Sequence, residues 1–518
     1  MRELKDLLSR NRRPLFIAGL TGFLLAILLI PLLWYSCFAI TNFDKKYVFY
    51  DGDTHVCTKA TEAEDCNLDN CYHCDEESGQ CVPDESRGAV DIDKDNFYTC
   101  EGGGLDCDDS KSDVNPSATE SCNMIDDNCN GIIDEEMLEA KGQLVEISSG
   151  KNPQIDYDGS QIDVVWEVEE ETNKRVKFAY LDTSGSIQSA KYLTDGNKNT
   201  FNMVEPSLAF YKNSQFGIAW IDCLGGRSGK FLFINPQNLP GPDGNIITFT
   251  EQSSTSQPYN PQVATFNDIS YIAVVWEEKQ KDNLSSSDIY LGFFDQNGSF
   301  ISERGRKNLS NTPEEESIQP SIVRAGSGFV IAWVEKSGET YEIKIGYIST
   351  GTGDFINQPM LLSNIPGFNK SNPSLGHDLN FGGSKSVVLF YDAQPQPNET
   401  RETYAVIIDL EKFENNENFA NNPIRVTNAF GASEKPAVVW RGNVIGVAWI
   451  DQRNGKKEIF FRRFSKDLKI ASDEINLGEG QDPSIVSFES DDKFAVVWWH
   501  LDNENSTKKI YFRSVGCK

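Results

Sequence analysis

The sequence is poor in histidine, in methionine and in basic residues. Only 4 His and 5 Met occur among 518 residues, which argues against a histidine-rich zinc protein and a methionine-rich copper protein. Lys and Arg total 48 against 78 Asp and Glu, so the formal net charge is -30. Binding to nucleic acid, or to anionic lipid by charge alone, requires basic surface. We therefore expect neither nucleic acid nor anionic lipid to be a partner through charge.

Charge is absent from one stretch near the N-terminus. No charged residue occurs from Leu15 to Phe43, and the 20 residues Leu15–Trp34 span roughly 30 Å as a helix, the thickness of a bilayer core. Five basic residues precede this stretch, so the positive-inside rule places the N-terminus in the cytoplasm. We expect a cytoplasmic tail at 1–14, one transmembrane helix at 15–40 and a periplasmic or extracellular remainder. A cleaved signal peptide is the alternative, although its apolar core is usually shorter.

Cysteine is concentrated in one acidic segment. Nine of the 12 Cys lie between Cys57 and Cys129, and residues 41–140 carry 27 acidic and 6 basic side chains. This segment has too few apolar residues for a core, so disulfides and metal must supply its order. After an export signal, the pattern predicts a disulfide framework. We expect a cysteine-rich segment at 41–90 and a metal-binding stalk at 91–141.

Oxygen ligands at alternate positions in this stalk predict structural Ca²⁺. The run from Asp126 to Asp134 matches positions 1, 3, 5, 6 and 9 of a calcium loop, with Gly131 at the sharp turn. Met137 replaces the usual Glu at position 12, so EF-hand helices are not expected. A zinc site at Cys71-x-x-Cys74 and a purely solubilising acidic spacer are the alternatives. The predicted ligands are Asp91, Asp93, Asp95, Phe97, Asp106, Asp108, Asp109, Asp126, Asn128, Asn130, Ile132 and Asp134.

These residues, with Asn115-Pro116 and Glu120-Ser-Cys122 between them, resemble the MopE-type metal-binding motif over residues 91–136. That motif recurs in bacterial surface and secreted proteins. The resemblance implies that Cys100 pairs with Cys107 and Cys122 with Cys129, and it implies no copper chemistry here. The segment from Cys74 to Cys81 is similar to the short disulfide loops found beside such motifs.

A repeating unit occupies the chain downstream of about residue 142. Each unit opens with a polar residue and Pro, continues as an apolar strand, and has a second strand ending in Trp or Phe. The Pro spacings are 53, 55, 59, 53, 63 and 47. Four short strands per unit, repeated seven times, predict an all-β, seven-bladed β-propeller over 142–518, with a solenoid as the alternative. The second strands end at Trp166, Trp220, Trp276, Trp333, Phe390, Trp449 and Trp498.

The ends of the repeat array predict how the ring closes. Repeat seven stops after its third strand, at Arg513, and Gln143–Ser148 can supply the missing fourth strand. The tryptophans are expected to pack between blades. We expect Cys223 to be a free or buried thiol. We expect Cys517 to pair with an unmatched member of the set Cys57, Cys66, Cys71, Cys74 and Cys81.

The opening polar residues form a possible ligand ring. If the Pro-led strands are innermost, these residues surround one mouth of a central channel; solvated loop ends are the alternative. The acidic residue after most of the tryptophans is expected to brace a hairpin turn. The ring residues are Asn152, Glu205, Asn260, Gln319, Asn372, Lys435 and Asp482.

Recognisable catalytic motifs are absent from the sequence. None of the 4 His lies in a triad or zinc motif. The stretch from Trp449 to Ile459 resembles a repeat of bacterial secreted propellers and is distantly similar to sialidase-type propellers, without their signature boxes. We expect a non-enzymatic, membrane-anchored binding or scaffolding protein with a protein or glycan ligand on a propeller face. An accessory subunit of a membrane complex and a glycan-active hydrolase or lyase are the alternatives.

Overall fold

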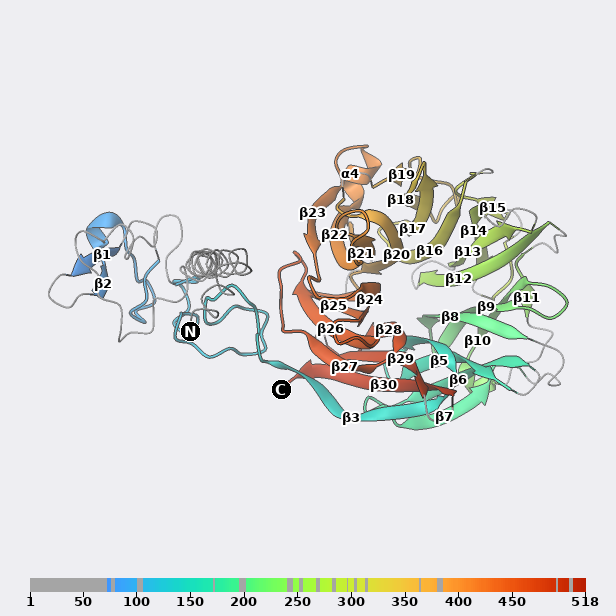
Figure 1. Ribbon diagram of the computed structural model, residues 1–518, viewed down its shortest axis with the longest axis horizontal. Coiled ribbons are helices and arrows are strands. Elements are labelled where there is room, and N and C mark those ends of the chain that lie inside the picture. Colours follow the sequence, from blue (N-terminus) through green and yellow to red (C-terminus); the bar gives the residue numbers. More distant parts are fainter. Residues whose placement is uncertain are drawn as a thin grey trace, which may run out of the picture. The chain divides into compact units, whose positions relative to one another are not determined.

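The fold is described from a computed structural model of the chain, shown in Figure 1. The chain divides into two compact units, one of residues 1–119 with 126–131 and one of 120–125 with 132–518. The structure describes residues 72–75, 80–99, 106–170, 173–194, 202–239, 246–250, 255–266, 271–281, 286–295, 297–301, 305–312, 315–362, 365–379, 385–490, 492–502 and 506–518.

The predicted transmembrane helix at 15–40 lies outside the described residues. Within those ranges, no helix combines the length and the apolar character that crossing a bilayer requires. The first unit contains the hairpin β1 (Tyr72–Asp75) and β2 (Gln80–Pro83), followed by the 3-10 turn η2 (Glu85–Arg87). Among the described residues of this unit, one small apolar cluster has Tyr72, Cys74 and Ala89 as its buried members.

The second unit contains seven four-stranded antiparallel sheets among its described residues, arranged radially in Figure 1. The prediction of an all-β, seven-bladed propeller is therefore confirmed. Blades 1 to 3 consist of β4 (Lys151–Tyr157), β5 (Ile162–Glu169), β6 (Lys174–Leu181), β7 (Ile187–Tyr192); β8 (Met203–Lys212), β9 (Gln215–Asp222), β10 (Ser228–Ile234), β11 (Ile247–Thr248); and β12 (Ser256–Phe266), β13 (Tyr271–Gln280), β14 (Ser287–Asp295), β15 (Lys307–Asn308).

Blades 4 to 7 repeat the same strand order. They consist of β16 (Ser317–Ala325), β17 (Gly328–Ser337), β18 (Thr340–Ser349), β19 (Met360–Leu361); β20 (Phe368–His377), β21 (Ser386–Gln394), β22 (Glu402–Asp409), β23 (Ala420–Arg425); β24 (Ser433–Arg441), β25 (Val444–Asp451), β26 (Glu458–Ser465), β27 (Ile475–Glu479); and β28 (Gln481–Ser487), β29 (Phe494–Asp502), β30 (Thr507–Cys517), β3 (Leu138–Ser149). Two short helical elements lie in the connections, η3 (Pro236–Asn238) and α4 (Leu410–Glu414).

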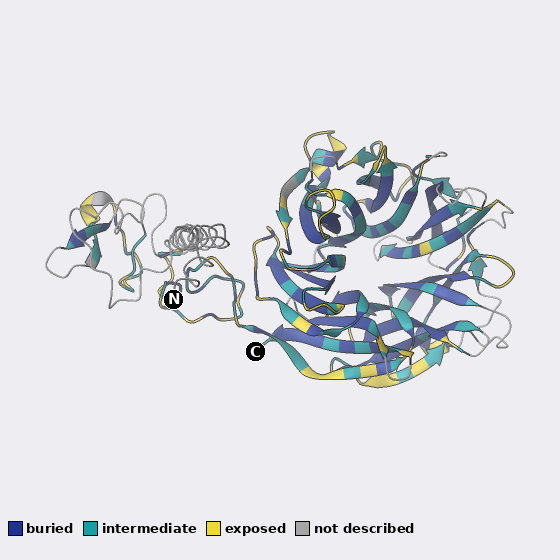
Figure 2. Ribbon diagram, viewed as in Figure 1, coloured by how far each residue is buried: buried dark blue, intermediate teal, exposed yellow. Residues whose placement is uncertain are grey.

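The core of the propeller is divided among the blade interfaces. Seven clusters of buried side chains each combine two neighbouring blades, and blade 7 packs in this way against blade 1. The second strands of the blades are almost entirely buried, and Figure 2 shows such buried stretches within the propeller. The repeated second-strand aromatics are at most 1% exposed and belong to these clusters. The prediction that they pack between blades is confirmed, and each large ring removes apolar surface from water on both sides of an interface.

Ring closure occurs as predicted. Strand β3 pairs antiparallel with β30, the third strand of blade 7, and thereby provides the fourth strand of that sheet. Strand β3 covers Leu138–Ser149 and is longer than the predicted segment. The first strand of the propeller thus covers the edge of the last blade, which would otherwise have unpaired backbone groups.

The disulfide pairing differs from the prediction. Cys107 pairs with Cys129, and Cys122 pairs with Cys517. The predicted pairs Cys100–Cys107 and Cys122–Cys129, and the predicted partner set for Cys517, are therefore wrong. The prediction paired cysteines that are close in the sequence. In the structure β3 pairs with β30, and this pairing places Cys517 beside the residues that immediately precede β3.

The remaining described cysteines fit the framework. Cys74 and Cys81 are both disulfide-bonded and lie opposite one another in the β1–β2 register. Cys223 is a free thiol, as predicted. Cys100 lies outside the described residues.

Candidate functional site

The first calcium-like loop brings carboxylates together in the first unit. Asp91, Asp93 and Asp95 place one oxygen each within 4.8 Å of one another, and so do Asp93, Asp106 and Asp109. Backbone donors fix the loop, because the amide N–H of Lys94 donates to Asp91 at 2.6 Å and that of Ile92 donates to Asp109 at 2.8 Å. Asp93 belongs to both groups, so the two runs of the motif converge on one carboxylate.

Three oxygens of this group have no hydrogen-bond partner. Oδ2 of Asp93, of Asp106 and of Asp109 is buried and makes no hydrogen bond within the described part of the chain. Their other oxygens accept backbone N–H groups of Asp95, Asp108 and Ile92 at 3.3, 2.9 and 2.8 Å. Three convergent orphaned carboxylate oxygens fit a hard cation, which takes oxygen ligands. The donor set therefore fits the metal that the motif implies.

The electrostatics of the group agree with this fit. Burial, and then repulsion from Asp95, Asp93 and Asp109, raises the pKa of Asp106 to about 6, although a backbone N–H opposes the shift. Burial and the neighbouring carboxylates also raise the pKa of Asp93. A divalent cation between these groups would neutralise the repulsion and return both to the ionised form.

Two further predicted ligands, Asp108 and Phe97, make hydrogen bonds within this region of the chain. Asp108 forms an ion pair with Lys111 and accepts a hydrogen bond from Ser110. Phe97 stands at the seventh position of the loop, where its carbonyl is the predicted ligand atom. Its backbone N–H donates to Asp95 at 2.8 Å.

Hydrogen bonds to Asp126 connect the two ends of the second calcium-like loop. Its Oδ1 accepts the N–H of Asn130 at 3.0 Å, and its Oδ2 accepts the N–H of Gly131 at 2.7 Å. Asn128 also accepts from Asn130, at 3.1 Å. Gly131 has φ +92°, the left-handed conformation that the predicted sharp turn requires. The side chain of Ile132 is 37% exposed.

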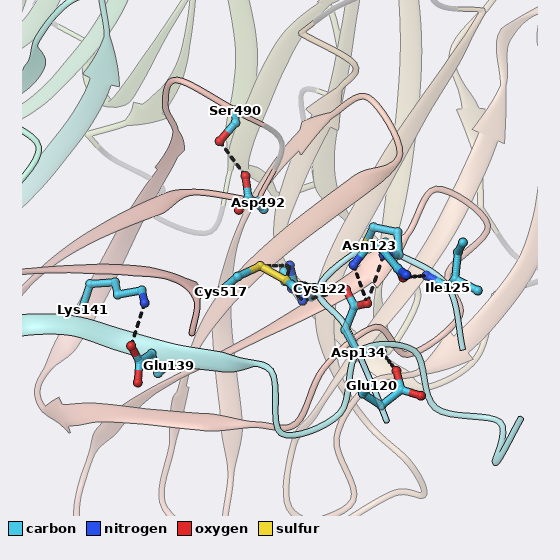
Figure 3. The surroundings of a disulfide bond; sticks show 12 residues. Glu120, Cys122, Asn123, Ile125, Asp134, Glu139, Lys141, Ser490, Asp492 and Cys517 are labelled. Atoms are coloured by element: carbon cyan, nitrogen blue, oxygen red, sulfur yellow. Dashed lines mark hydrogen bonds and ion pairs between the residues drawn. A yellow bond between two sulfur atoms is a disulfide. The ribbon is translucent and has the colours of Figure 1, made fainter. Parts of the chain in front are cut away.

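Asp134, the predicted ninth ligand, lies in a buried ion pair. Its Oδ2 is 3.0 Å from Nη2 of Arg463, and both side chains are fully buried. Its Oδ1 accepts the backbone N–H of Asn123 and of Met124, each at 3.0 Å, as Figure 3 shows for Asn123. Asp134 is therefore held by an arginine and by backbone donors.

The Cys122–Cys517 disulfide lies beside this ion pair. Arg463 approaches the sulfur of Cys122 at 3.5 Å and that of Cys517 at 3.6 Å. Glu120 accepts the backbone N–H of Asp134 at 2.9 Å (Figure 3). Residues on both sides of the Asp126–Gly131 loop are thus fixed to the propeller unit, through β26 and the end of β30. We call this group of Glu120, Cys122, Asp134, Arg463 and Cys517 the clamp.

A central channel runs between the innermost strands of the propeller. Strands β4, β8, β12, β16, β20, β24 and β28 contact one another in sequence, and β28 contacts β4. They line a cavity of about 830 Å³. The prediction that the Pro-led strands are innermost is confirmed.

The predicted ligand ring is a ring of strained bulges. All seven ring residues have φ between 48° and 55°, although none is glycine. At each of them the pairing with the second strand of the blade shifts register. The left-handed conformation is unfavourable for most residues, so other contacts must hold it in every blade.

Hydrogen bonds and ion pairs between neighbouring blades stabilise this left-handed conformation. Glu167 accepts the N–H of Glu205 at 3.4 Å, and Glu205 accepts the N–H of Asn260 at 2.8 Å. Farther round the ring, Gln319 accepts the N–H of Asn372 at 2.8 Å, and Asp392 accepts the N–H of Lys435 at 3.0 Å. Lys435 forms an ion pair with Asp482. The acidic residues after the second-strand aromatics therefore bind the bulge of the next blade rather than only bracing a hairpin.

A second layer of contacts was missed from the sequence. Serine follows the repeated proline in four blades, and its hydroxyl accepts a backbone N–H of the next innermost strand. Ser207, Ser321, Ser374 and Ser484 accept from Val263, Leu375, Val438 and Ile155 at 3.1, 3.1, 3.2 and 3.2 Å. The recurring Pro-Ser pair was the available signal, and it marks the joints between blades.

Comparison with known families identifies the metal-binding motif. The model of the MopE-type metal-binding motif matches residues 106–135, which confirms the resemblance. The match includes both the second loop and three residues of the clamp. No curated protein matches the sequence of this chain.

Solved structures with some similarity include a lyase, an arabinanase and a sialidase. The polysaccharide lyase Uly1 has a TM-score of 0.45 at 10% identity, over 70% of this chain and 89% of that chain. An α-L-arabinanase of Penicillium chrysogenum has a TM-score of 0.39 at 10% identity, over 72% and 98%. A sialidase of Trypanosoma rangeli has a TM-score of 0.37 at 12% identity, over 70% and 53%.

Proposed function

We propose that the chain is a non-enzymatic binding or scaffolding protein of the cell surface or periplasm. One N-terminal helix would anchor it in the membrane, with residues 1–14 in the cytoplasm. A stalk stabilised by Ca²⁺ and disulfides would hold the propeller, and a propeller face would bind a protein or glycan ligand.

The main support is that carboxylates at the ring mouth accept hydrogen bonds from the backbone of the next blade. Glu167, Glu205 and Asp392 each accept a backbone N–H across a blade interface through one carboxylate oxygen, and these bonds help to hold the ring together. A general acid or base must instead exchange protons with a substrate. A rigid ring whose carboxylates help to hold its blades together suits recognition rather than turnover.

The test of display is the topology of the full chain in its membrane. A tag at the C-terminus should be accessible to protease from outside the intact cell or spheroplast, and Cys107, Cys122, Cys129 and Cys517 should resist alkylation until reduced. A cytosolic tag with reduced thiols would contradict the proposal. Extraction in mild detergent followed by crosslinking should then recover the bound partner.

A glycan-active enzyme is a second candidate because of one observation in the channel. Asp156 lines the cavity, and burial raises its pKa to about 6, although N–H groups of Phe210 and Tyr157 donate to it. A carboxyl with a raised pKa in a cavity is a feature of general acids. Release of new reducing or unsaturated ends from a glycan panel, abolished in Asp156→Asn, would favour this candidate over the binding role.

A further inference from the structure

Six Asn-x-Ser/Thr sequons occur in the sequence, and none of them takes part in the proposed function. In an exported protein this motif is the acceptor for an N-linked glycan, which needs both the Asn side chain and the hydroxyl two residues later. The chain is rich in Asn, so sequons also arise by chance. The structure separates them by whether both groups are free. The six begin at Asn283, Asn297, Asn308, Asn369, Asn398 and Asn505, of which Asn283 and Asn505 lie outside the described residues.

The sequon at Asn308 is built into blade 3. Nδ2 of Asn308 donates to Asp288 at 2.9 Å and to the hydroxyl of Tyr290 at 3.3 Å. The hydroxyl of Ser310, which is 9% exposed, donates to Asp288 at 2.7 Å. Asn308 also pairs with Tyr290 in the β14–β15 register. A sugar on Nδ2 of Asn308 would break contacts that hold the outer strand of the blade, so this sequon serves the fold.

The sequon at Asn369 is likewise engaged within blade 5. Nδ2 of Asn369 donates to Gln394 at 3.0 Å. The hydroxyl of Ser371 donates to Asp392 at 2.6 Å. Lys370, the residue between them, is 2% exposed. Neither group of this sequon can be presented to an enzyme, or carry a sugar, while blade 5 keeps these contacts.

The sequon at Asn297 is free in both of its groups. Asn297 and Ser299 are exposed, and neither side chain makes a hydrogen bond within the described residues. They lie in the connection between β14 and β15, where Oδ1 of Asp295 accepts the backbone N–H of each at 2.8 Å. Gly298 between them has φ +77° and donates its own N–H to the carbonyl of Asp295. The turn is thus fixed through its backbone, and its amide and hydroxyl side chains stay available.

The sequon at Asn398 has the same free groups. Asn398, Glu399 and Thr400 are exposed, and the side chains of Asn398 and Thr400 make no hydrogen bond in the part of the chain that the structure describes. They lie between β21 and β22, where the carbonyl of Glu399 accepts Nε2 of Gln394 at 3.1 Å. Asn398 has φ +72°, a conformation that Asn adopts more often than most residues. This turn is also held through its backbone, and a sugar on Asn398 would break no contact.

We infer that Asn297 and Asn398 carry N-linked glycans, and that Asn308 and Asn369 do not. We call the first two the free sequons and the other two the engaged sequons. This inference rests on the proposed export of the chain, because the acceptor turns must reach the compartment in which glycans are attached. It adds a modification to the two exposed turns and assigns the engaged sequons to the fold.

The reaction needs a sugar donor of one chemical class, a lipid-linked oligosaccharide whose anomeric carbon is bound to phosphate. Nδ2 of the asparagine forms a bond to that carbon, and the bond from the carbon to the phosphate oxygen breaks. The lipid phosphate leaves with the electron pair, and the amide nitrogen loses one proton. No oxidant or reductant takes part.

The test is a glycopeptide map of the full chain, extracted from its own membranes in mild detergent. After proteolysis, mass spectrometry should find sugar mass on the peptides of both free sequons and the unmodified mass on those of both engaged sequons. On a denaturing gel, Asn297→Gln and Asn398→Gln should each migrate farther than the wild type, and the double variant farther still, because each change removes one glycan.

The hydroxyls supply a second set of variants that keeps each asparagine. Ser299→Ala and Thr400→Ala should lose the sugar of their own sequon, whereas Ser299→Thr should retain it, because the motif needs only the hydroxyl. The matched controls are Asn308→Gln and Asn369→Gln. They should leave the gel mobility unchanged and lower the melting temperature, since these two amides hold contacts within the blades.

Three outcomes overturn the inference: unmodified mass at either free sequon, sugar at an engaged sequon, or wild-type mobility of Ser299→Ala or Thr400→Ala. If the free sequons are unmodified while protease reaches a C-terminal tag from outside, the inference fails and the proposed function stands. A cytosolic tag would refute both.

Discussion

Asp163 shows how a single residue can set the pH response of a blade. It lies in β5, is fully buried, and neither of its carboxyl oxygens has a hydrogen-bond partner within the described residues. Its cross-strand neighbours are Asp156 and Tyr180. Burial, and then Asp158 and Asp156, raises its pKa to about 9.

The expected consequence is a loss of stability as pH rises. The folded state holds a proton on Asp163 that the unfolded state releases near pH 4, so its contribution declines between about pH 4 and pH 9. Asp163→Asn mimics the protonated form of the side chain. At pH 8 its free energy of unfolding should exceed that of the wild type by roughly 1–3 kcal/mol, so the variant should unfold at a higher urea concentration. Urea unfolding at pH 5 and pH 8 checks this. A variant with the wild-type pH slope would show that another group is responsible.

The clamp gives a second prediction at the residue scale. Asp134→Asn leaves the fully buried Arg463 without its carboxylate, which should cost about 3–5 kcal/mol of unfolding free energy. Lys385→Gln, which breaks an exposed ion pair with Glu411, is the control and should cost less than about 1 kcal/mol. Similar losses in both variants, measured by chemical denaturation, would show that burial of the pair contributes nothing.

At the scale of elements, the features that recur in every blade could be predicted from the sequence, whereas contacts that occur once between distant segments could not. The innermost strands, the inter-blade aromatics and the closing strand β3 followed from patterns present in nearly every unit. The disulfide partners and the ion pair of Asp134 could not be predicted, because they depend on which distant segments meet. Asp134 fits a calcium loop by spacing, and only its proximity to β26 reveals Arg463.

The closing strand leads to a prediction about the disulfide. Cys122 and Cys517 join segments 395 residues apart, beside the β3–β30 pairing. The double variant Cys122→Ser, Cys517→Ser should lower the unfolding free energy of the propeller by about 2–4 kcal/mol, because the open chain gains entropy. Cys223→Ser, at the free thiol, should change little. Calorimetry of both variants would test this, and equal melting temperatures would contradict it.

At the scale of the whole molecule, stability is divided between two kinds of order. The propeller unit has an apolar cluster at each blade interface, whereas the described part of the first unit has one small cluster. The first unit relies instead on disulfides and on the carboxylates of the metal group. Conditions that leave the propeller intact should therefore still unfold the first unit.

Chelation tests this division. EDTA should lower the melting temperature of the first unit by several degrees while the propeller transition stays in place, because a metal bound only by the folded state stabilises it. Ca²⁺ should restore the transition and Mg²⁺ should restore less, since Mg²⁺ accepts a narrower ligand geometry. Asp93→Asn should imitate EDTA, whereas Asp113→Asn, on an exposed side chain, should not. A transition that ignores EDTA would refute the calcium assignment.

The shared sheet of blade 7 also orders events during synthesis. Strand β3 is the earliest of the propeller strands to emerge from the ribosome, and its partner β30 is the latest. The nascent chain must therefore keep β3 exposed while six blades assemble behind it. A chaperone that shields this single waiting strand would protect the protein more than one that acts on any finished blade.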